Sequence, residues 1–343
     1  MKQKFRDPYF DNAKYLLMVF VVFGHLLQPF IEQAAWSKNL YFSIYTFHMP
    51  AFILISGYFA KSFDYKKADQ VRMSFQKFIL PYLFFQWIYT FFYWLIGARE
   101  SFSFQLHIPN WSLWFLISSF FWQVSLYFFQ KVPPKVGISI SILLSLLVGY
   151  IPFLNRELTL QRTFVFLPFF VIGYYLKPEA VEKFRQWQYK KFLGFGFLVI
   201  YAVIQMVDIW DKHVFFGSKP YEDFLNFPEW GGFVRIVTFL LAWVGILAFF
   251  ALVPAKHKPY TENGRYTLVA YLLHGFIVQG LRGINIQSLP FNALTAIIVL
   301  VGSIVLTYVL SSEPVGELYA SIEQTLLGYN HKPKKKITLH NQN

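Results

Sequence analysis

The sequence contains no cysteine and few charged residues. The lack of Cys among 343 residues excludes disulfides, thiolate catalysis and cysteine-ligated metal centres. Charged residues make up 14% of the chain, whereas a soluble domain carries about 25%. A chain that is 56% hydrophobic and this poor in charge cannot bury its apolar surface in one soluble core. Lipid must therefore solvate part of that surface.

Long apolar runs are abundant, and they determine the expected fold class. A membrane-spanning helix needs roughly 17–25 mostly apolar residues. Ten segments meet or approach this length, which predicts an all-α, polytopic integral membrane protein with about ten transmembrane helices. The predicted spans are 15–31, 41–60, 78–97, 112–130, 136–153, 163–176, 192–208, 233–253, 266–285 and 291–311.

The basic residues are distributed unevenly between the loops. The net charge of +13 first suggests an anionic partner such as nucleic acid. With the N-terminus inside, however, 22 of the 31 Lys and Arg fall in cytoplasmic segments and 8 in outer segments, and Lys14 lies at the inner edge of the first span. The positive-inside rule then places both termini in the cytoplasm. We therefore expect membrane lipid rather than nucleic acid as a partner, and a multi-pass location in the plasma (cytoplasmic) membrane.

The chain divides into a membrane-embedded domain, 1–312, and a polar cytoplasmic tail, 313–343. The tail ends in a basic cluster that we expect to face the anionic inner leaflet. The cluster consists of Lys332, Lys334, Lys335 and Lys336.

Three histidines fall inside predicted spans, where ionisable groups are costly and usually functional. His25 follows Lys14 by 11 residues, or ~16 Å of helix rise. His48 and His274 are ~18 Å and ~14 Å from the cytoplasmic ends of their spans by the same count. A single such histidine is explained as well by a structural role, a neutral imidazole bonded to a neighbouring helix, as by a functional one. Three at one depth favour proton transfer, whereas no spacing in the sequence supports a three-histidine metal site.

Several other residues have two interpretations. Ser56-Gly57 permits close backbone approach, at a substrate or simply between packed helices. Trp114 belongs to an aromatic belt or to a sugar-stacking surface, and Arg162 is an outer anchor or a substrate contact. Arg72 and Lys77 precede a predicted span on the cytoplasmic side. They are equally well explained as phosphate contacts of a soluble cofactor and as positive-inside charge.

The longest outer loop, 209–232, contains several charged or titratable residues, among them Asp211, Lys212 and His213. It forms either part of an extracytoplasmic substrate surface or a solvated loop anchored by interfacial tryptophans.

Several motifs, each short, resemble those of one known family. Asp11-Asn-Ala-Lys14, followed by ten residues and His25, resembles the Arg/Lys-x₁₀-His signature of the membrane-bound acyltransferase-3 family. The resemblance continues in family order to about residue 310. The further motifs are Phe47-His-Met-Pro-Ala-Phe-Ile-Leu-Ile-Ser-Gly-Tyr58, Trp114-Phe-Leu116, Arg162-Thr-Phe to Gly173-Tyr-Tyr, and Gly264-Arg-Tyr-Thr-Leu to Tyr271-Leu-Leu-His274. These motif sequences are most similar to those of the branch described as fucose 4-O-acetylase and related acetyltransferases.

This resemblance implies ten membrane helices and transfer of an acyl group, usually acetyl from acetyl-CoA, to a hydroxyl of a cell-surface sugar, polymer or lipid-linked sugar. The family often has Arg-x-x-Arg before the Pro-Tyr of its third span. Here the basic residues are Arg72 and Lys77, spaced differently. We expect no appended second catalytic domain, so any separate extracytoplasmic transferase would be another protein. No metal is expected.

Together these observations give one mechanistic hypothesis. CoA phosphates rest on Arg72, Lys77 and Lys14, and the thioester reaches His25, which acts as general base or as a transient acyl carrier. The catalytic candidates are His25, Lys14, His48 and His274. The substrate-binding candidates are Asp11, Asn12, Ser56, Trp114, Arg162 and Tyr271. Tyr271 and His274 share a helix face, because they are three residues apart.

A function of another class also fits the intramembrane histidines. They would serve equally as a proton relay in a transporter or flippase for a sugar-lipid. Such proteins often show internal repeats and paired broken helices, and we find neither pattern in this sequence.

Overall fold

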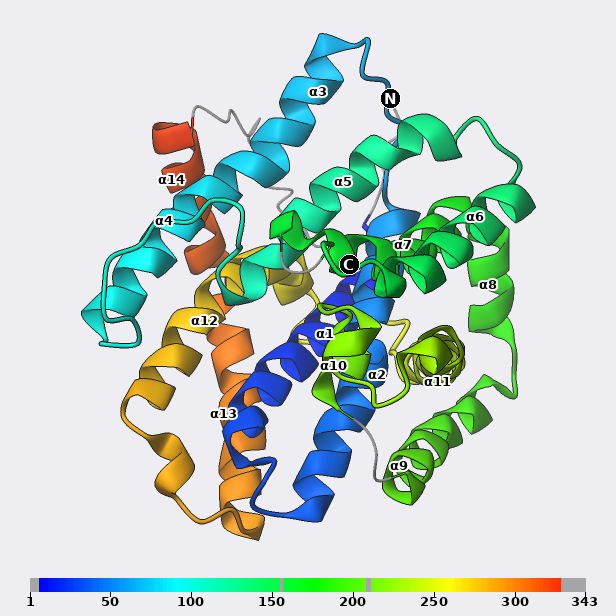
Figure 1. Cartoon of the computed structure of the whole chain (residues 1–343). Helices are drawn as coiled ribbons and strands as arrows, with labels where there is room; N and C mark the ends of the chain where they lie inside the picture. The colour runs from blue at the N-terminus through cyan, green and yellow to red at the C-terminus, as the bar shows by residue number, and fades with distance from the viewer. Residues whose placement is uncertain (1–5, 155–156, 208–210, 328–343) are drawn as a thin grey trace, which may run out of the picture.

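The computed structural model describes residues 6–154, 157–207 and 211–327, and its regular structure there is entirely helical (Figure 1). The predicted all-α class is therefore confirmed for this part of the chain. The tail cluster of Lys332, Lys334, Lys335 and Lys336 lies outside the described residues. The α-helices are α1 (Pro8–Leu27), α2 (Ala35–Tyr58), α3 (Ala68–Ser74), α4 (Leu80–Leu95), α5 (Trp114–Phe129), α6 (Pro134–Leu147), α7 (Leu160–Tyr175), α8 (Pro178–Gln186), α9 (Gly196–Met206), α10 (Lys212–Phe216), α11 (Gly231–Leu252), α12 (Thr267–Gly283), α13 (Ala293–Leu310) and α14 (Glu313–Leu327).

Several of these helices are long and apolar enough to cross a bilayer, as expected of a membrane protein. Six stretches qualify within the described residues, and a bent pair adds a seventh. The six are Pro8–Phe30, Ala35–Tyr58, Ala68–Leu95, Trp111–Phe129, Pro228–Leu252 and Ala293–Leu310. The bent pair joins Glu157–Tyr175 to Pro178–Gln186 at 89°, and Pro134–Tyr150 is a shorter apolar helix. The count of ten spans and the location of the termini stay predictions.

The helix that carries Arg72 and Lys77 begins earlier than the apolar run indicates. Residues 68–95 form one helical stretch rather than a loop and a span. A π-helical turn, Phe75–Ile79, directly precedes Pro81 in the first turn of α4. The wider turn accommodates a proline that lacks a backbone N–H. Both basic side chains therefore project from an exposed helical surface.

The tail also begins with a helix. Val315, Tyr319 and Ile322 of α14 recur at helical spacing and are half-buried, which gives the helix an apolar stripe. Tyr319 packs against a cluster that includes Phe85 of α4. The composition of 313–343 is polar on average, and that average hides this stripe.

The centre of the molecule is formed by α1 and α2, which the other helices surround (Figure 1). Helices α2 and α7 approach each other closely at two glycines. A Cβ atom on Gly57 would lie 2.0 Å from the Phe170 carbonyl oxygen, and one on Gly173 would lie 2.2 Å from the Leu54 carbonyl oxygen. Only glycine fits at either position, so Gly57 serves helix packing. The tight pair fixes α2, and with it His48, relative to α7.

Candidate active site

A cavity of about 750 Å³ lies among α1, α2, α7, α10 and α12. Its lining includes His25, His48, Trp114, Arg162 and Tyr271, all of which the sequence analysis names as candidate site residues. The connection between α4 and α5 and the segment 212–219 supply much of the remaining wall. Both segments belong to the side predicted to be outside.

The three histidines that the sequence predicts inside spans come together beside this cavity. The ring centroids of His25 and His274 are 5.5 Å apart. His25 and His48 both contact Tyr45: its hydroxyl lies 3.1 Å from His25 Nδ1, and its ring centroid lies 4.7 Å from that of His48. His274 is fully buried and stands just behind the lining. Helices distant in sequence thus bring three imidazoles into one cluster.

Backbone contacts fix the tautomer of two of these rings. His48 Nδ1 lies 2.8 Å from the Ile44 carbonyl oxygen, and His274 Nδ1 lies 2.7 Å from that of Tyr271. A carbonyl oxygen only accepts, so both Nδ1 atoms donate, and in the neutral imidazole both Nε2 atoms carry a lone pair. Nε2 of His274 is buried and has no hydrogen-bond partner among the described residues. The bond between His25 and Tyr45 permits either tautomer of His25.

Trp111 closes the histidine cluster on one side. Its ring centroid lies 4.3 Å from that of His25 and 5.1 Å from that of His274. Its backbone φ is +38°, a conformation that is uncommon for a bulky side chain and is often found where function requires it. Tyr271 Oη donates to the carbonyl oxygen of neighbouring Ser112, which holds this segment against α12.

Two arginines stack on tryptophans of the cavity wall. Arg282 lies over Trp111 at 5.8 Å, and Arg162 lies over Trp114 at 4.9 Å. Arg282 also donates to the His25 carbonyl oxygen at 3.1 Å and to Gln28 Oε1 at 2.8 Å. One guanidinium is therefore attached to the helical turn that carries His25.

The segment 212–219 brings part of the long outer loop into the cavity wall. Lys212, His213, Ser218 and Lys219 line the cavity. Burial lowers the pKa of His213 to about 4, and the opposing charge of Asp211 only partly offsets that effect. The imidazole is therefore neutral at neutral pH.

Six of the predicted site residues lie elsewhere. Ser56 donates to the Phe52 carbonyl oxygen within its own helix. Arg72 and Lys77 are exposed on the stretch 68–79 and line neither this cavity nor an apolar groove beside α8. The remaining three, Asp11, Asn12 and Lys14, form a polar network at the start of α1.

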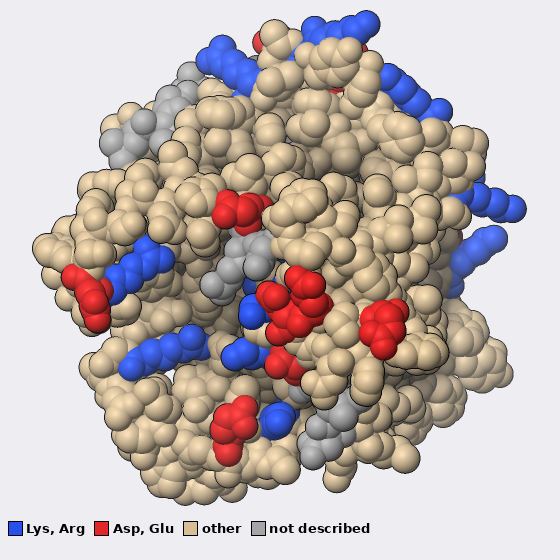
Figure 2. Space-filling view, viewed as in Figure 1, with Lys and Arg blue, Asp and Glu red and all other residues tan. Residues whose placement is uncertain are grey.

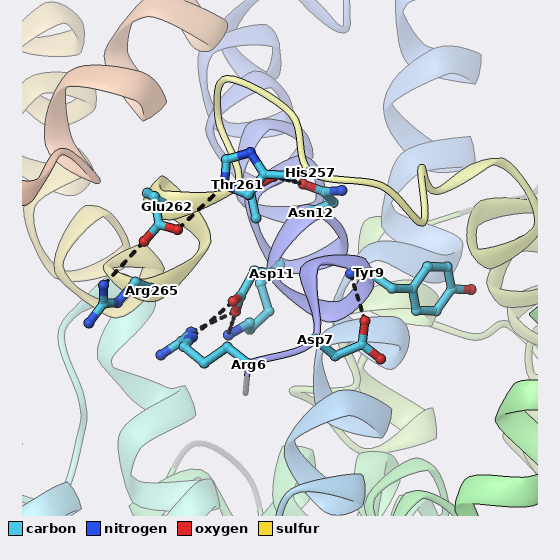
Figure 3. A network of polar contacts seen from close by, with 10 residues as sticks. Arg6, Asp7, Tyr9, Asp11, Asn12, His257, Thr261, Glu262 and Arg265 are labelled. Atoms are coloured by element: carbon cyan, nitrogen blue, oxygen red, sulfur yellow. Dashed lines mark hydrogen bonds and ion pairs between the residues drawn. The ribbon is translucent and has the colours of Figure 1, made fainter. Parts of the chain in front are cut away.

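Figure 3 shows how this network connects α1 to the segment before α12. Asp11 accepts from Arg6 at 2.6 and 2.9 Å and pairs with Lys14 at 2.7 Å. Asn12 donates to two carbonyl oxygens of the segment 254–256 and accepts from Thr261 at 2.6 Å. These contacts account for Asp11 and Asn12 as residues that position α1. Their predicted roles toward substrate, and that of Lys14 in catalysis, stay predictions.

Three residues of the site are not among those predicted from the sequence: Tyr45, Trp111 and Arg282. Tyr45 and His48 have the same three-residue spacing as Tyr271 and His274, so the rule applied to one pair would have found the other. Trp111 has no such signal, because its inward position depends on the fold of the outer loop. Among the described residues, no group of three His, Asp or Glu side chains is arranged to hold a metal ion.

Comparison with known proteins connects these residues to an acyl-transfer family. The sequence model of the acyltransferase-3 family, described as an acyltransferase domain, matches residues 7–312. "Nodulation protein NolL" of Mesorhizobium japonicum is 42% identical over 84 residues, which cover 23% of this chain and 22% of that protein. The protein of the same name from Sinorhizobium fredii is 47% identical over 58 residues, 16% of each chain. The chain thus aligns with less than a quarter of either relative. No solved structure matches.

Proposed function

The chain belongs to the acyltransferase-3 family and is a membrane acyltransferase, and on this premise we propose that it moves an acetyl group from cytoplasmic acetyl-CoA to a hydroxyl of a cell-surface or lipid-linked sugar. The observation that carries the proposal is the position of His25. Its imidazole lines the large cavity, beside His274 and within hydrogen-bond distance of Tyr45. The protein would act in the plasma (cytoplasmic) membrane.

In the base mechanism, His25 takes the proton of the sugar hydroxyl while the hydroxyl oxygen attacks the thioester carbonyl. The new C–O bond forms, the C–S bond breaks, and the CoA thiolate receives the proton from the imidazolium. In the carrier mechanism, a nitrogen of the His25 imidazole attacks the thioester carbonyl, so that a C–N bond forms, the C–S bond breaks and the CoA thiolate leaves. The sugar hydroxyl then attacks this acyl group, so that the C–O bond forms, the C–N bond breaks, and the hydroxyl proton goes to the thiolate. His48, His274 and Tyr271 orient the reacting groups in both mechanisms.

The donor approaches from the cytoplasmic end of α1. Lys14 lies ~16 Å of helix rise from His25, so the CoA phosphates would stay near the inner surface while the thioester reaches the cavity. Arg72 and Lys77 are the proposed phosphate contacts, and their exposure on the stretch 68–79 leaves them accessible to a soluble donor.

The acceptor approaches from the opposite side. Trp111 and Trp114 line the cavity, and aromatic rings of this kind stack against sugar faces. The wall built from 98–112 and 212–219 belongs to the predicted outer loops, which suits a surface sugar. Delivery of the acylated sugar to a further polymer would need a separate extracytoplasmic transferase.

The test compares His25→Ala with His257→Ala in cells that lack the chromosomal gene. His257 has a 61% exposed side chain, lies in the segment before α12 and does not line the cavity. At equal abundance in the membrane, we expect His257→Ala to restore the O-acetyl ester of the cell envelope and His25→Ala to leave it absent. Retention of the ester in His25→Ala would refute the central role of His25.

The base and carrier mechanisms are separated by trapping. The purified protein is incubated with radiolabelled acetyl-CoA and no acceptor, then quenched and separated from free donor. Label that stays on the wild type but not on His25→Ala supports the carrier mechanism. Absence of label in a wild type that is active toward an acceptor supports the base mechanism.

A further inference from the structure

The large cavity is strongly positive. Five Lys and Arg residues line it, and no Asp or Glu is among its described lining residues. They are Arg99, Arg162, Lys212, Lys219 and Arg282. In Figure 2, Lys and Arg atoms are visible in recesses near the centre of the face, while several Asp and Glu side chains stand on the surface around them.

Most of this charge is not neutralised within the fold. Lys219 approaches Asp223 at 3.9 Å. Within residues 6–154, 157–207 and 211–327, by contrast, no carboxylate pairs with Arg99, Lys212 or Arg282. Arg99 is held instead by Asn110 Oδ1 at 2.6 Å. Like charges gathered in a concave site that is partly shielded from solvent repel one another and lose solvation. The presence of these cations therefore indicates a ligand of opposite charge.

Arg282 connects this charge to the reacting centre. One of its nitrogens donates to the His25 backbone, while its Nε is buried and has no hydrogen-bond partner among the described residues. Guanidinium groups bind phosphate and carboxylate oxygens through parallel N–H bonds. An anion held by Arg282 would therefore lie within one sugar unit of a hydroxyl at His25.

We propose that the acceptor carries an anionic group, a phosphate or a carboxylate, close to the hydroxyl that is acylated. This inference rests on the proposed transfer to a sugar and specifies the class of that sugar. A neutral sugar needs hydrogen bonds and aromatic stacking, but it gives no reason for five cations around one cavity. The nucleotide phosphates of the donor are the competing anion. The predicted orientation places them on the other side of the membrane.

Binding is measured on the purified full-length protein without acetyl-CoA, so the result does not depend on catalysis. The probes are methyl glucoside, glucose 1-phosphate, methyl glucuronide and 3′,5′-ADP, which stands for the donor nucleotide. We expect the phosphorylated or the carboxylated sugar to bind at least ~10-fold more tightly than the neutral one, the ratio that one charge-assisted hydrogen bond gives. The better of the two identifies the anion.

Two variants locate the anion, and one serves as control. Arg282→Gln removes the cation next to His25, whereas Lys212→Gln changes an exposed side chain and is safe for folding. Lys38→Gln removes an outer cation that does not line the cavity. We expect the preference for the charged sugar to fall toward 1 in Lys212→Gln and Arg282→Gln and to stay unchanged in Lys38→Gln.

Two outcomes would overturn the proposal. The first is equal affinity for neutral and charged sugars in the wild type. The second is binding of 3′,5′-ADP that depends on Lys212 and Arg282 while no sugar anion is preferred, which would assign the cavity to the donor. Either result leaves the acyl-transfer proposal intact, because that proposal fails only if His25→Ala keeps the envelope ester.

Discussion

Tyr45→Phe tests whether the histidine cluster acts as a unit. Tyr45 Oη lies 3.1 Å from His25 Nδ1, and the Tyr45 ring packs against Gly24, where a Cβ atom would lie 2.8 Å from the ring. Phenylalanine keeps this packing and removes only the oxygen. The change therefore leaves His25 in place without its hydrogen-bond partner.

The magnitude follows from the charge that His25 gains in the base mechanism. As His25 takes a proton, its Nδ1–H bond to Tyr45 becomes charge-assisted, and such a bond contributes about 1.5–3 kcal/mol. Loss of that contribution in the transition state lowers kcat/KM by roughly 10- to 150-fold. A bond that stays neutral contributes only about 0.5–1.5 kcal/mol, or roughly 2- to 13-fold.

The assay is acetyl transfer by purified protein in lipid nanodiscs, with thermal denaturation measured in parallel. Tyr89→Phe is the matched control, because the buried Tyr89 hydroxyl donates at 2.7 Å to the Leu272 carbonyl oxygen and does not line the cavity. Both variants lose one hydrogen bond, so both should lose similar stability. A fall in kcat/KM of less than twofold in Tyr45→Phe, or an equal fall in Tyr89→Phe, would refute the reasoning.

Three further predictions concern packing, pH and orientation. Gly173→Ala forces a Cβ atom against a backbone carbonyl of α2 and should lower the free energy of unfolding by about 1–3 kcal/mol. The measurement is a lower melting temperature in detergent. Gly302→Ala is the control and should be neutral, because a Cβ atom at Gly302 would have no atom within 4 Å. The pKa of His213, lowered to about 4 from 6.5, means that the folded state resists protonation and loses stability as pH falls from about 6.5 toward about 4. His213→Gln should flatten the melting-temperature profile over that window, and an unchanged profile would contradict the assignment. Because the chain has no cysteine, the single-cysteine variants Glu222→Cys and Lys67→Cys report on which side of the membrane each residue lies. An impermeant maleimide should label only Glu222→Cys in intact cells. Labelling of Lys67→Cys alone would contradict the proposed mechanism.

The sequence was informative wherever the property concerned one helix at a time. Counting residues at the rise of an α-helix predicted a similar depth for His25, His48 and His274, and the structure brings the three rings into one cluster, of which His25 and His48 line the cavity. Spacing of three residues placed Tyr271 beside His274, and their ring centroids are 5.7 Å apart. Both inferences depend only on the geometry of a single helix.

Inferences that required the position of one segment relative to another were weaker. Trp111 was not among the predicted site residues, and residues 209–232 were equally well explained as a solvated loop. In the structure the ring of Trp111 packs against both His25 and His274. The segment 212–219 lines the same cavity, whereas Arg72 and Lys77 project from an exposed helical surface.

The sequence alone determined that the chain is helical and that it resides in a membrane, and it predicted a similar depth for three of its histidines. Lipid enforces these properties locally, since every backbone polar group must be paired within its own helix and every charge has a cost that depends on depth. The tertiary structure decided which face of each helix points inward and which outer segments fold over the histidines. The sequence of a helix that is apolar on every side does not indicate which face points inward. Packing such as that of Gly57 and Gly173 sets the rotation of these helices. The five cations of the cavity become one site only after that packing is complete.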